Sequence, residues 1–274
     1  MENGETIRIR VNERSVCVRS GTRVGDLIER FRPGADVLIR KGAPVSADTL
    51  VEAGDEVVLI RRGEQPGPEE MEWLLTARHT PGVHEKVKAA CVGIAGVGGL
   101  GSAVAVALAR SGFGRLILAD FDVVEPSNLN RQQYFVDQIG LPKVEALREN
   151  LRRIHPYVRV ETQRVRLKAE NLFEVFGDVD VLVEAFDRAD AKAMLVNTAR
   201  RERPGLPVVA ASGVAGAHSS NTVVTRRMGP NFYLVGDGEH AARPGEGLMA
   251  PRVGVAAHHQ ANAVLRIVLG MPAG

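Results

Sequence analysis

A glycine-rich turn at residues 96–101 is the first feature of the sequence that could do chemistry. Gly96-Val97-Gly98-Gly99-Leu100-Gly101 lies between an apolar run, predicted to be a strand, and a predicted helix. Without β-carbons, the backbone N–H groups of the turn and the N-terminus of the helix can approach a phosphate closely. Glycines can also serve only to pack a strand tightly against a helix. The turn therefore favours a phosphate-bearing ligand, but it does not separate a nicotinamide dinucleotide from ATP.

Two acidic residues follow the next apolar run. Asp120 closes the predicted strand within RLILADFD, and Asp122 comes two residues later. A carboxylate at the end of this strand can hydrogen-bond the hydroxyl pair of a ribose, as either kind of nucleotide requires. Asp122 would lie on the same face if the strand continued, and it could equally be a solvated carboxylate.

A polar run and a lysine supply the residues that distinguish the two ligands. Asn128, Arg131 and Gln132 come just beyond the predicted ribose site, and Lys143 begins the next predicted helix. A lysine in the first turn opposes the helix dipole, so it is a poor choice for structure alone. Two cations beside a glycine turn suit a polyphosphate whose charge must be neutralised during displacement. The alternative is that Arg131 and Lys143 are ordinary surface residues.

Asp187 is a further candidate carboxylate, at the end of the apolar run DVLVEAF. In open α/β sheets, ligands bind beyond the carboxyl ends of the strands, so we expect Asp187 to face the same crevice. Beside two phosphates it would hold Mg²⁺, which takes one or two carboxylates together with phosphate oxygens. Glu184, three residues earlier, is expected to point away from Asp187 and is given no role.

The elements that must position these residues alternate between strands and helices from residue 91 onward. Such alternation predicts an α/β fold, a Rossmann-like, doubly wound and mostly parallel sheet with helices on both faces. Residues 7–62 have a different order, a hairpin, a helix and then more strands, which is typical of a small α+β ubiquitin-like β-grasp domain. We expect the β-grasp domain at 1–63, a linker and arm helix at 64–80 with Trp73 as a core anchor, and the nucleotide-binding domain at 81–274.

The composition of the 274 residues excludes several classes of protein. A net charge of +2 gives no reason to expect nucleic acid or an anionic membrane as a partner. No apolar span of about 18 residues and no secretion signal is visible, so we expect a soluble, cytoplasmic protein. Cys17 and Cys91 lie in strand-like apolar runs and are expected to be buried and reduced. No C-x-x-C pair is present, which excludes a zinc site of that kind.

The combined motifs resemble the ubiquitin-activating-like adenylyltransferases that include ThiF, MoeB and HesA. The resemblance covers residues 78–270 and is carried by G-x-G-G-x-G, DFDVVEPSNLNRQ and IGLPK. VEAFDRADAKAML, AASGVAGAHSSN and GLMAPRVGVAAHHQANAVLRIVLG look like the compact ThiF subfamily in particular. Residues 7–62 resemble ThiS, the sulfur carrier of thiamin biosynthesis, through IRVNER and LVEAGDEVVLIRRG.

The resemblance implies that the chain adenylates the C-terminal Gly-Gly carboxylate of a ThiS-type carrier with Mg-ATP, releases pyrophosphate and works as a homodimer. A carboxylate is already ionised at neutral pH, so positioning and charge neutralisation suffice without a general base. The catalytic residues that it implies are Arg131, Lys143 and Asp187, with Asp187 as the Mg²⁺ ligand. The nucleotide-binding residues that it implies are Gly96, Gly98, Gly99, Gly101, Asp120, Asp122, Asn128 and Gln132.

The sequence departs from this family in three ways. Many relatives carry C-x-x-C pairs for zinc, and larger ones use a cysteine in a covalent step, for which Cys91 is expected to be too buried. Family members usually show Asp-Asn and an arginine where this chain has Asp187-Arg188 and Lys192.

The ThiS-like domain lacks a free Gly-Gly carboxylate, because Gly63 continues into the linker. We therefore expect a docking or regulatory pseudo-carrier, with processing after Gly63 as the alternative.

Other functions remain open at this point. A nicotinamide-dependent oxidoreductase would use the glycine turn and Asp120 but would leave Arg131, Lys143 and Asp187 idle. A non-catalytic binder would use the nucleotide fold only to present the ThiS-like domain to a partner. Adenylation of a molybdopterin-type carrier, or of a small-molecule carboxylate, would keep the chemistry and change the acceptor.

A few polar residues outside the motifs are further candidates for a role. Arg78 lies where relatives send an arginine into the ATP site of the neighbouring protomer. The adjacent His258 and His259 do not have the i, i+4 spacing of helical metal ligands, so we expect them to pack or to lie at the surface. His218 and Asn221 could lie along the path of the carrier's tail or in a plain loop.

Overall fold

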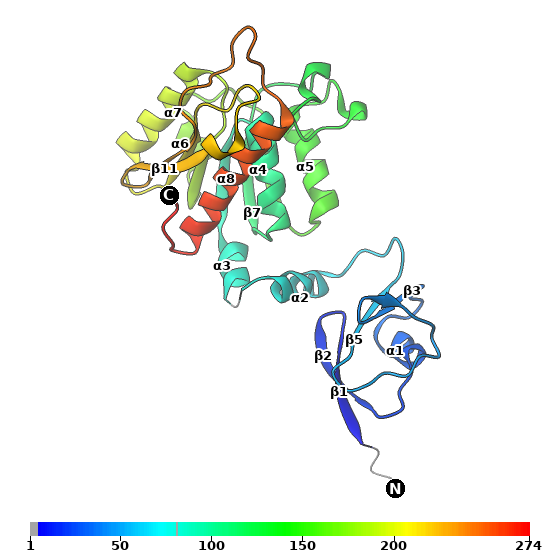
Figure 1. The fold of residues 1–274 in the computed structure, drawn as a ribbon. Coiled ribbons are helices and arrows are strands. Elements are labelled where there is room, and N and C mark those ends of the chain that lie inside the picture. The colour runs from blue at the N-terminus through cyan, green and yellow to red at the C-terminus, as the bar shows by residue number, and fades with distance from the viewer. Residues whose placement is uncertain (1–4, 81) are drawn as a thin grey trace. The chain divides into compact units, whose positions relative to one another are not determined.

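The computed structural model describes residues 5–80 and 82–274, which form two compact units, Met1–Pro81 and Gly82–Gly274 (Figure 1). The first unit is a five-stranded sheet with one helix packed on it. Its strands have the order β2-β1-β5-β3-β4, with β1 parallel to β5 and the other neighbours antiparallel. Their bounds are β1 Thr6–Val11, β2 Arg14–Arg19, α1 Val24–Phe31, β3 Val37–Arg40, β4 Ala43–Pro44 and β5 Glu56–Ile60. The predicted ubiquitin-like order is confirmed, and β4 is an addition to it.

The core of the first unit follows from the alternation of its strands. Ile9, Val18 and Leu59 point inward and pack against Leu27 of the amphipathic helix α1. Successive side chains of a strand point to opposite faces, so Cys17, beside Val18, lies on the solvent side. The prediction that Cys17 is buried was therefore wrong.

Helix α2 (Pro68–Arg78) and the residues before it belong to the first unit. The Arg32 guanidinium lies 2.6 Å from the Glu70 carboxylate and 3.1 Å from that of Glu64. Trp73 is 37% exposed, with the guanidinium of Arg14 stacked 3.8 Å from its ring centre. Trp73 was predicted to be a core anchor, and this was wrong, because α2 has no buried residue and is held by ion pairs and this stacked arginine.

The second unit is a seven-stranded sheet in the order β11-β12-β10-β9-β6-β7-β8. All neighbours are parallel except β11, which runs antiparallel to β12 at one edge. The strands are β6 Cys91–Ala95, β7 Arg115–Ala119, β8 Arg159–Gln163, β9 Val181–Glu184, β10 Val208–Ala211, β11 Val224–Gly229 and β12 Phe232–Gly236. The helices are α3 Val83–Ala89, α4 Gly99–Arg110, α5 Lys143–Ile154, α6 Leu172–Val175, α7 Ala189–Glu202 and α8 Ala250–Val268, with 3-10 turns η1 Pro126–Asn128, η2 Val136–Gln138 and η3 Ser220–Thr222. The predicted Rossmann-like fold class is confirmed.

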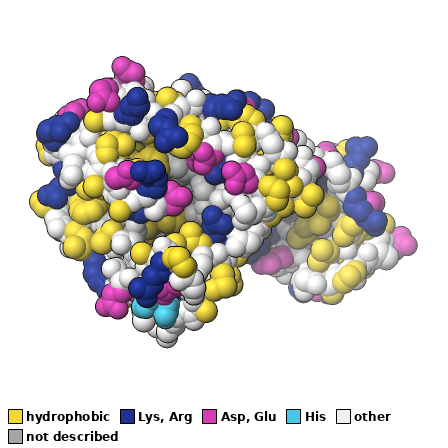
Figure 2. Space-filling view, turned by 90° about the horizontal axis from the view of Figure 1, so that it is seen from above, with side chains coloured by type: hydrophobic (Ala, Val, Ile, Leu, Met, Phe, Trp, Pro, Cys, Tyr) yellow, Lys and Arg dark blue, Asp and Glu magenta, His cyan; other side chains and the backbone are white. Residues whose placement is uncertain are grey.

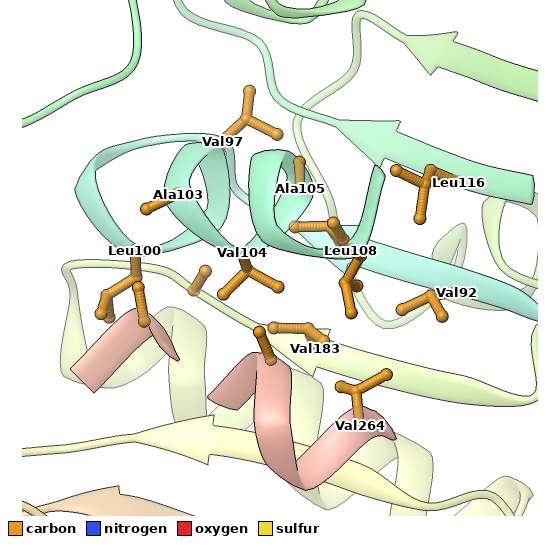
Figure 3. Packing of buried hydrophobic residues seen from close by; sticks show 14 of the residues in the cluster. Val92, Val97, Leu100, Ala103, Val104, Ala105, Leu108, Leu116, Val183 and Val264 are labelled. Atoms are coloured by element: carbon orange, nitrogen blue, oxygen red, sulfur yellow. The ribbon is translucent and has the colours of Figure 1, made fainter. Parts of the chain in front are cut away.

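Alternate residues of the central strands supply two cores, one on each face of the sheet. On one face, residues of α4, α5 and α8 pack on the strands, and on the other face α6 and α7 do so. Figure 3 shows side chains from α4 and α8 meeting those of three strands. The labelled ones include Val104, Leu108, Val264, Val92, Leu116 and Val183. None of the helices within residues 5–80 and 82–274 has both the length and the apolar character needed to cross a bilayer.

The topology fixes where a ligand can bind in the second unit. From β6 the chain continues to β7 and β8 on one side, and then crosses to β9 and β10 on the other side. The loops that follow β6 and β9 therefore leave in opposite directions, which opens a crevice at the carboxyl ends of these strands.

Candidate functional site

A cavity of about 900 Å³ occupies this crevice. Its walls come from the segments that follow β6, β7, β8, β9 and β10, together with the loop before α8 and the start of that helix. Figure 2 shows a face of the molecule on which acidic and basic side chains are interspersed with apolar ones. Ten of the eleven predicted site residues line the cavity, namely Gly96, Gly98, Gly99, Asp120, Asp122, Asn128, Arg131, Gln132, Lys143 and Asp187.

The glycine turn joins β6 to α4 and exposes backbone to the cavity. Gly96 has φ of +86°, a conformation that favours glycine, and its N–H donates to the carbonyl of Ala119. Gly98 caps α4, which begins at Gly99. Gly101 is the third residue of α4, where a β-carbon would overlap the carbonyl oxygen of Gly96. Gly101 therefore makes close packing of helix and turn possible, and it does not line the cavity.

Asp120 connects the glycine turn to the loop after β7. One carboxylate oxygen accepts from the backbone N–H of Val97 at 2.8 Å, and the other accepts from that of Asp122 at 2.9 Å. Each oxygen has a second lone pair. The side chain can therefore hold the turn and still accept a hydrogen bond from a hydroxyl group in the cavity.

Lys143 and Asp122 form an ion pair at the edge of the cavity. The Lys143 side chain is only 8% exposed, and its Nζ lies 3.0 Å from Oδ2 of Asp122. The Lys143 N–H also donates to the Asp122 carbonyl at 3.0 Å. Asp122 thus supplies negative charge at the N-terminus of α5, which offsets the unfavourable position of a lysine there. The Asp122 side chain is 46% exposed, so it is both ion-paired and in contact with solvent.

Residues of the polar run also line the cavity, and two of them lie next to the glycine turn. The Arg131 guanidinium donates to Oδ1 of Asn130 at 2.8 Å, and its stem passes close to Gly99. Asn128 is buried, and its Oδ1 accepts from the backbone N–H of Glu125, which caps the turn η1. Gln132 is also buried, and within the described residues its Oε1 has no hydrogen-bond partner. Arg131 and Gln132 therefore have polar groups that a ligand could engage.

Asp187 lies in the loop between β9 and α7, exposed to the cavity. The start of this loop is fixed by Glu184, whose Oε1 accepts from the backbone N–H of Phe186 at 2.7 Å. Lys192, which also lines the cavity, lies 3.0 and 3.1 Å from the two Glu184 oxygens and donates to the Ala211 carbonyl at 3.0 Å. Burial raises the pKa of the Glu184 carboxyl, and Lys192 acts in the opposite direction. Leaving Glu184 without a role was wrong, because it positions the loop that carries Asp187.

The sequence analysis assigned no role to some residues that line the cavity, or to the buried Glu184, which pairs with Lys192 of the cavity wall. A glutamate inside an apolar strand was a usable signal for Glu184, and the spacing of Lys192 was noted only as a departure from the family. Phe121 and Arg166 also line the cavity, with the guanidinium 3.7 Å from the ring centre. They gave no signal, because residues 45 positions apart come together only through the pairing of β7 with β8.

Other sequence-based predictions concern residues outside the cavity. Cys91 is buried, as predicted, and burial raises the pKa of its thiol, so it is poorly suited to a covalent step. Arg78 donates to Glu13 of its own unit at 2.7 Å. His258 hydrogen-bonds the Gly254 carbonyl and His259 lies 3.2 Å from the Thr225 hydroxyl, in line with a packing or surface role.

The chain was compared with known families and proteins. The ThiF family model matches residues 74–274, and the ThiS-like ubiquitin model matches residues 7–63. Ubiquitin-like modifier-activating enzyme 5 of Caenorhabditis briggsae is 38% identical over 43% of the chain and 30% of its own length. The adenylyltransferase and sulfurtransferase UBA4 of Candida glabrata is 31% identical over 68% of the chain and 44% of its own length. The molybdopterin-synthase adenylyltransferase of Haemophilus influenzae is 38% identical over 40% of the chain and 46% of its own length.

Solved structures share the fold of the second unit. The E. coli tRNA N6-threonylcarbamoyladenosine dehydratase TcdA, in complex with AMP, has a TM-score of 0.65 and 22% identity, covering 72% of this chain and 92% of TcdA. E. coli MccB with MccA-N7isoASN has a TM-score of 0.52 and 25% identity, covering 68% of this chain and 58% of MccB. The chain spans less than half the length of the three curated relatives, and the family model covers well over half of the chain. The chain belongs to the ThiF family.

Proposed function

We propose that the second unit uses Mg-ATP to adenylate the C-terminal carboxylate of a ubiquitin-like carrier protein and releases pyrophosphate. The observation that carries this proposal is the convergence of the glycine turn, Arg131, Lys143 and Asp187 on one cavity at the switch point of the sheet. Two curated relatives are named adenylyltransferases, and TcdA has been solved with ATP and with AMP. A hydride transfer from a nicotinamide cofactor would give Arg131, Lys143 and Asp187 no role in the reaction.

The nucleotide would bind with its phosphates over the amides at the N-terminus of α4. Partial positive charge at this helix end favours the phosphates, and Gly98 and Gly99 let them approach the backbone. The Asp120 carboxylate would accept hydrogen bonds from the ribose hydroxyls. Arg131 and Lys143, which both line the cavity, would neutralise the triphosphate.

The residues present fit a magnesium ion held at Asp187. This carboxylate is exposed to the cavity, and no hydrogen bond to it is made within the described residues. One carboxylate together with phosphate oxygens is a ligand set that Mg²⁺ takes readily. When bound, Mg²⁺ would supply positive charge to the phosphates of the leaving group. Glu184 and Lys192 would keep the Asp187 loop in place.

The reaction itself needs no proton transfer from the protein. The acceptor carboxylate is ionised at neutral pH. One of its oxygens forms a bond to the α-phosphorus, and the bond from that phosphorus to the oxygen bridging to the β-phosphate breaks. The electron pair leaves with pyrophosphate. The protein therefore has to align two anions and offset their repulsion, which are roles for Arg131 and Lys143.

The acceptor that we favour is a separate carrier of the ThiS type, in thiamin biosynthesis, and we expect the enzyme to work as a homodimer. The fused ThiS-like unit supports this choice of acceptor. That unit offers no free carboxylate at Gly63, because Gly63 is in peptide linkage to Glu64, which pairs with Arg32 at 3.1 Å. We therefore propose that it docks or regulates. Intact mass spectrometry of the purified protein tests this, since a chain cleaved after Gly63 would make the unit a carrier instead.

The test is carrier-dependent exchange of labelled pyrophosphate into ATP. We expect exchange with a carrier that ends in Gly-Gly and none with the same carrier lacking these two residues. A molybdopterin-type carrier run in parallel distinguishes the two acceptors. Loss of exchange in Asp187→Ala, in a protein that retains its unfolding temperature, would support the magnesium role. Absence of exchange with every carrier, or tighter binding of NAD than of ATP, would contradict the proposal.

A further inference from the structure

A cluster of two histidines and a glutamate lies beside the nucleotide cavity. His218 belongs to the loop after β10, and His240 and Glu246 belong to the loop between β12 and α8. One potential ligand atom from each of the three lies within 4.8 Å of the other two. Nε2 of His218 is 2.5 Å from Oε1 of Glu246, and the imidazole rings of His218 and His240 are stacked with centres 3.5 Å apart, so one ring would have to turn for both to bind the same ion. Figure 2 shows histidine side chains at the surface next to acidic and basic ones.

A carboxylate behind His240 orients this cluster. Nδ1 of His240 lies 2.7 Å from Oδ2 of Asp237, which leaves Nε2 as the nitrogen able to face an ion. Asp237 also accepts from two backbone N–H groups and from the buried Arg252 guanidinium. A carboxylate on the outer nitrogen of a histidine is the usual support of a metal ligand.

The backbone leaves room for an ion beside the ligand atoms. Gly216 has φ of +75°, and a β-carbon there would lie 2.8 Å from Nε2 of His218 and 3.1 Å from Oε1 of Glu246. A hollow of about 500 Å³, open to solvent, is lined by Gly216, His218, Arg243 and Glu246. A β-carbon at residue 216 would therefore crowd both side chains, and glycine leaves this side of the two ligand atoms open.

We propose that His218, His240 and Glu246 bind a divalent transition-metal ion of the zinc type. Two imidazole nitrogens and one carboxylate oxygen, with water as the fourth ligand, form a common four-coordinate set for Zn²⁺. The ion replaces the hydrogen bond between His218 and Glu246 and takes up neutral imidazoles. It is distinct from the magnesium that we assign to Asp187, because nitrogen ligands suit zinc and oxygen ligands suit magnesium.

Binding of this ion would join two loops at the rim of the nucleotide cavity. His218 lies in the segment 213–219 and Glu246 in the segment 237–249, and residues of both segments line the cavity, including His240. A metal there fixes one loop to the other without any contact with ATP. The role that we infer for the ion is therefore structural, and it does not depend on the adenylation proposal.

The experiment uses Co²⁺ as a probe, because four-coordinate Co²⁺ absorbs visible light and competes with Zn²⁺ for the same sites. The full-length protein is stripped with a chelator, desalted and titrated with Co²⁺ near neutral pH. We expect one Co²⁺ per chain, with visible absorption bands that disappear when one equivalent of Zn²⁺ is added. Asp237→Asn should weaken binding by roughly 10–100-fold, which is the usual effect of losing an outer-shell partner.

Variants identify the ligands. His218→Ala, His240→Ala and Glu246→Ala should each lose the absorption bands, while circular dichroism checks that the fold is retained. His258→Ala is the matched control, since His258 is an exposed histidine of the same unit that lies outside the cluster. Absence of the bands in the unaltered protein would overturn the proposal. Equal Co²⁺ binding by the three variants and the control would overturn it as well.

Discussion

Replacing Glu184 by glutamine tests how much the buried ion pair with Lys192 contributes to the stability of the second unit. Glutamine keeps the oxygen that accepts from the Phe186 N–H and removes only the charge. Glu184 is fully buried, and the Lys192 side chain is 24% exposed. Removing one partner of a buried pair costs about 3–5 kcal/mol. Lys192 can still reach water in the cavity, so we expect the lower end, about 3 kcal/mol. For a unit of this size that lowers the unfolding temperature by about 6–12 °C.

Differential scanning calorimetry of the full chain measures this effect. Trp73 lies in the first unit, so its fluorescence follows that unit and serves as an internal reference. Glu161→Gln is the matched control: this carboxylate pairs with Arg115 and Arg159 near the surface and should contribute only about 0–1 kcal/mol. The double variant Glu184→Gln/Lys192→Met, which removes both charges, should recover most of the lost stability. An effect of Glu184→Gln no larger than that of Glu161→Gln would refute this reasoning.

Three other predictions concern separate parts of the protein. Arg131→Ala should lower the rate of pyrophosphate exchange by about 10²-fold or more. An unchanged rate would show that Arg131 is an ordinary surface residue with no part in the reaction. Gly101→Ala places a β-carbon on backbone and should cost about 1–3 kcal/mol with weaker ATP binding. The helical control Gly254→Ala, with open space around it, should cost nothing. Cys17 should react with a thiol reagent in the native protein and Cys91 only after unfolding, and equal rates would contradict the assigned burial.

The fold was predictable because the hydrophobic pattern and the glycine turn describe the same arrangement. Strands that are apolar along all or most of their length, such as β6 and β9, predicted a sheet covered on both faces, and the alternation with helices predicted parallel pairing. The hydrophobic pattern gave a wrong prediction of burial for Cys17 and Trp73. Cys17 lies in an apolar run but on its solvent side, and Trp73 lies on a helix held mainly by charged residues.

The candidate site was predictable as far as its residues follow strand ends. Asp120, Asp187 and the glycine turn follow β7, β9 and β6, and the topology alone brings these strand ends together. Contacts between side chains on different elements could not be predicted from a single sequence. The partnership of Glu184 with Lys192, and that of Asp122 with Lys143, depends on how helices dock on the sheet. The histidine cluster was also missed, because its two loops are more than 20 residues apart in the chain and meet only in the folded structure.

Analysis of the products formed from ATP tests the central claim most directly. The protein is incubated with Mg-ATP, pyrophosphatase-free buffer and a carrier that ends in Gly-Gly, and the phosphorus-containing products are resolved by ³¹P NMR. Attack on the α-phosphorus predicts pyrophosphate together with AMP or the acyl-adenylate, in equal amounts and only when the carrier is present. Formation of ADP and phosphate, or carrier-independent turnover, would contradict it.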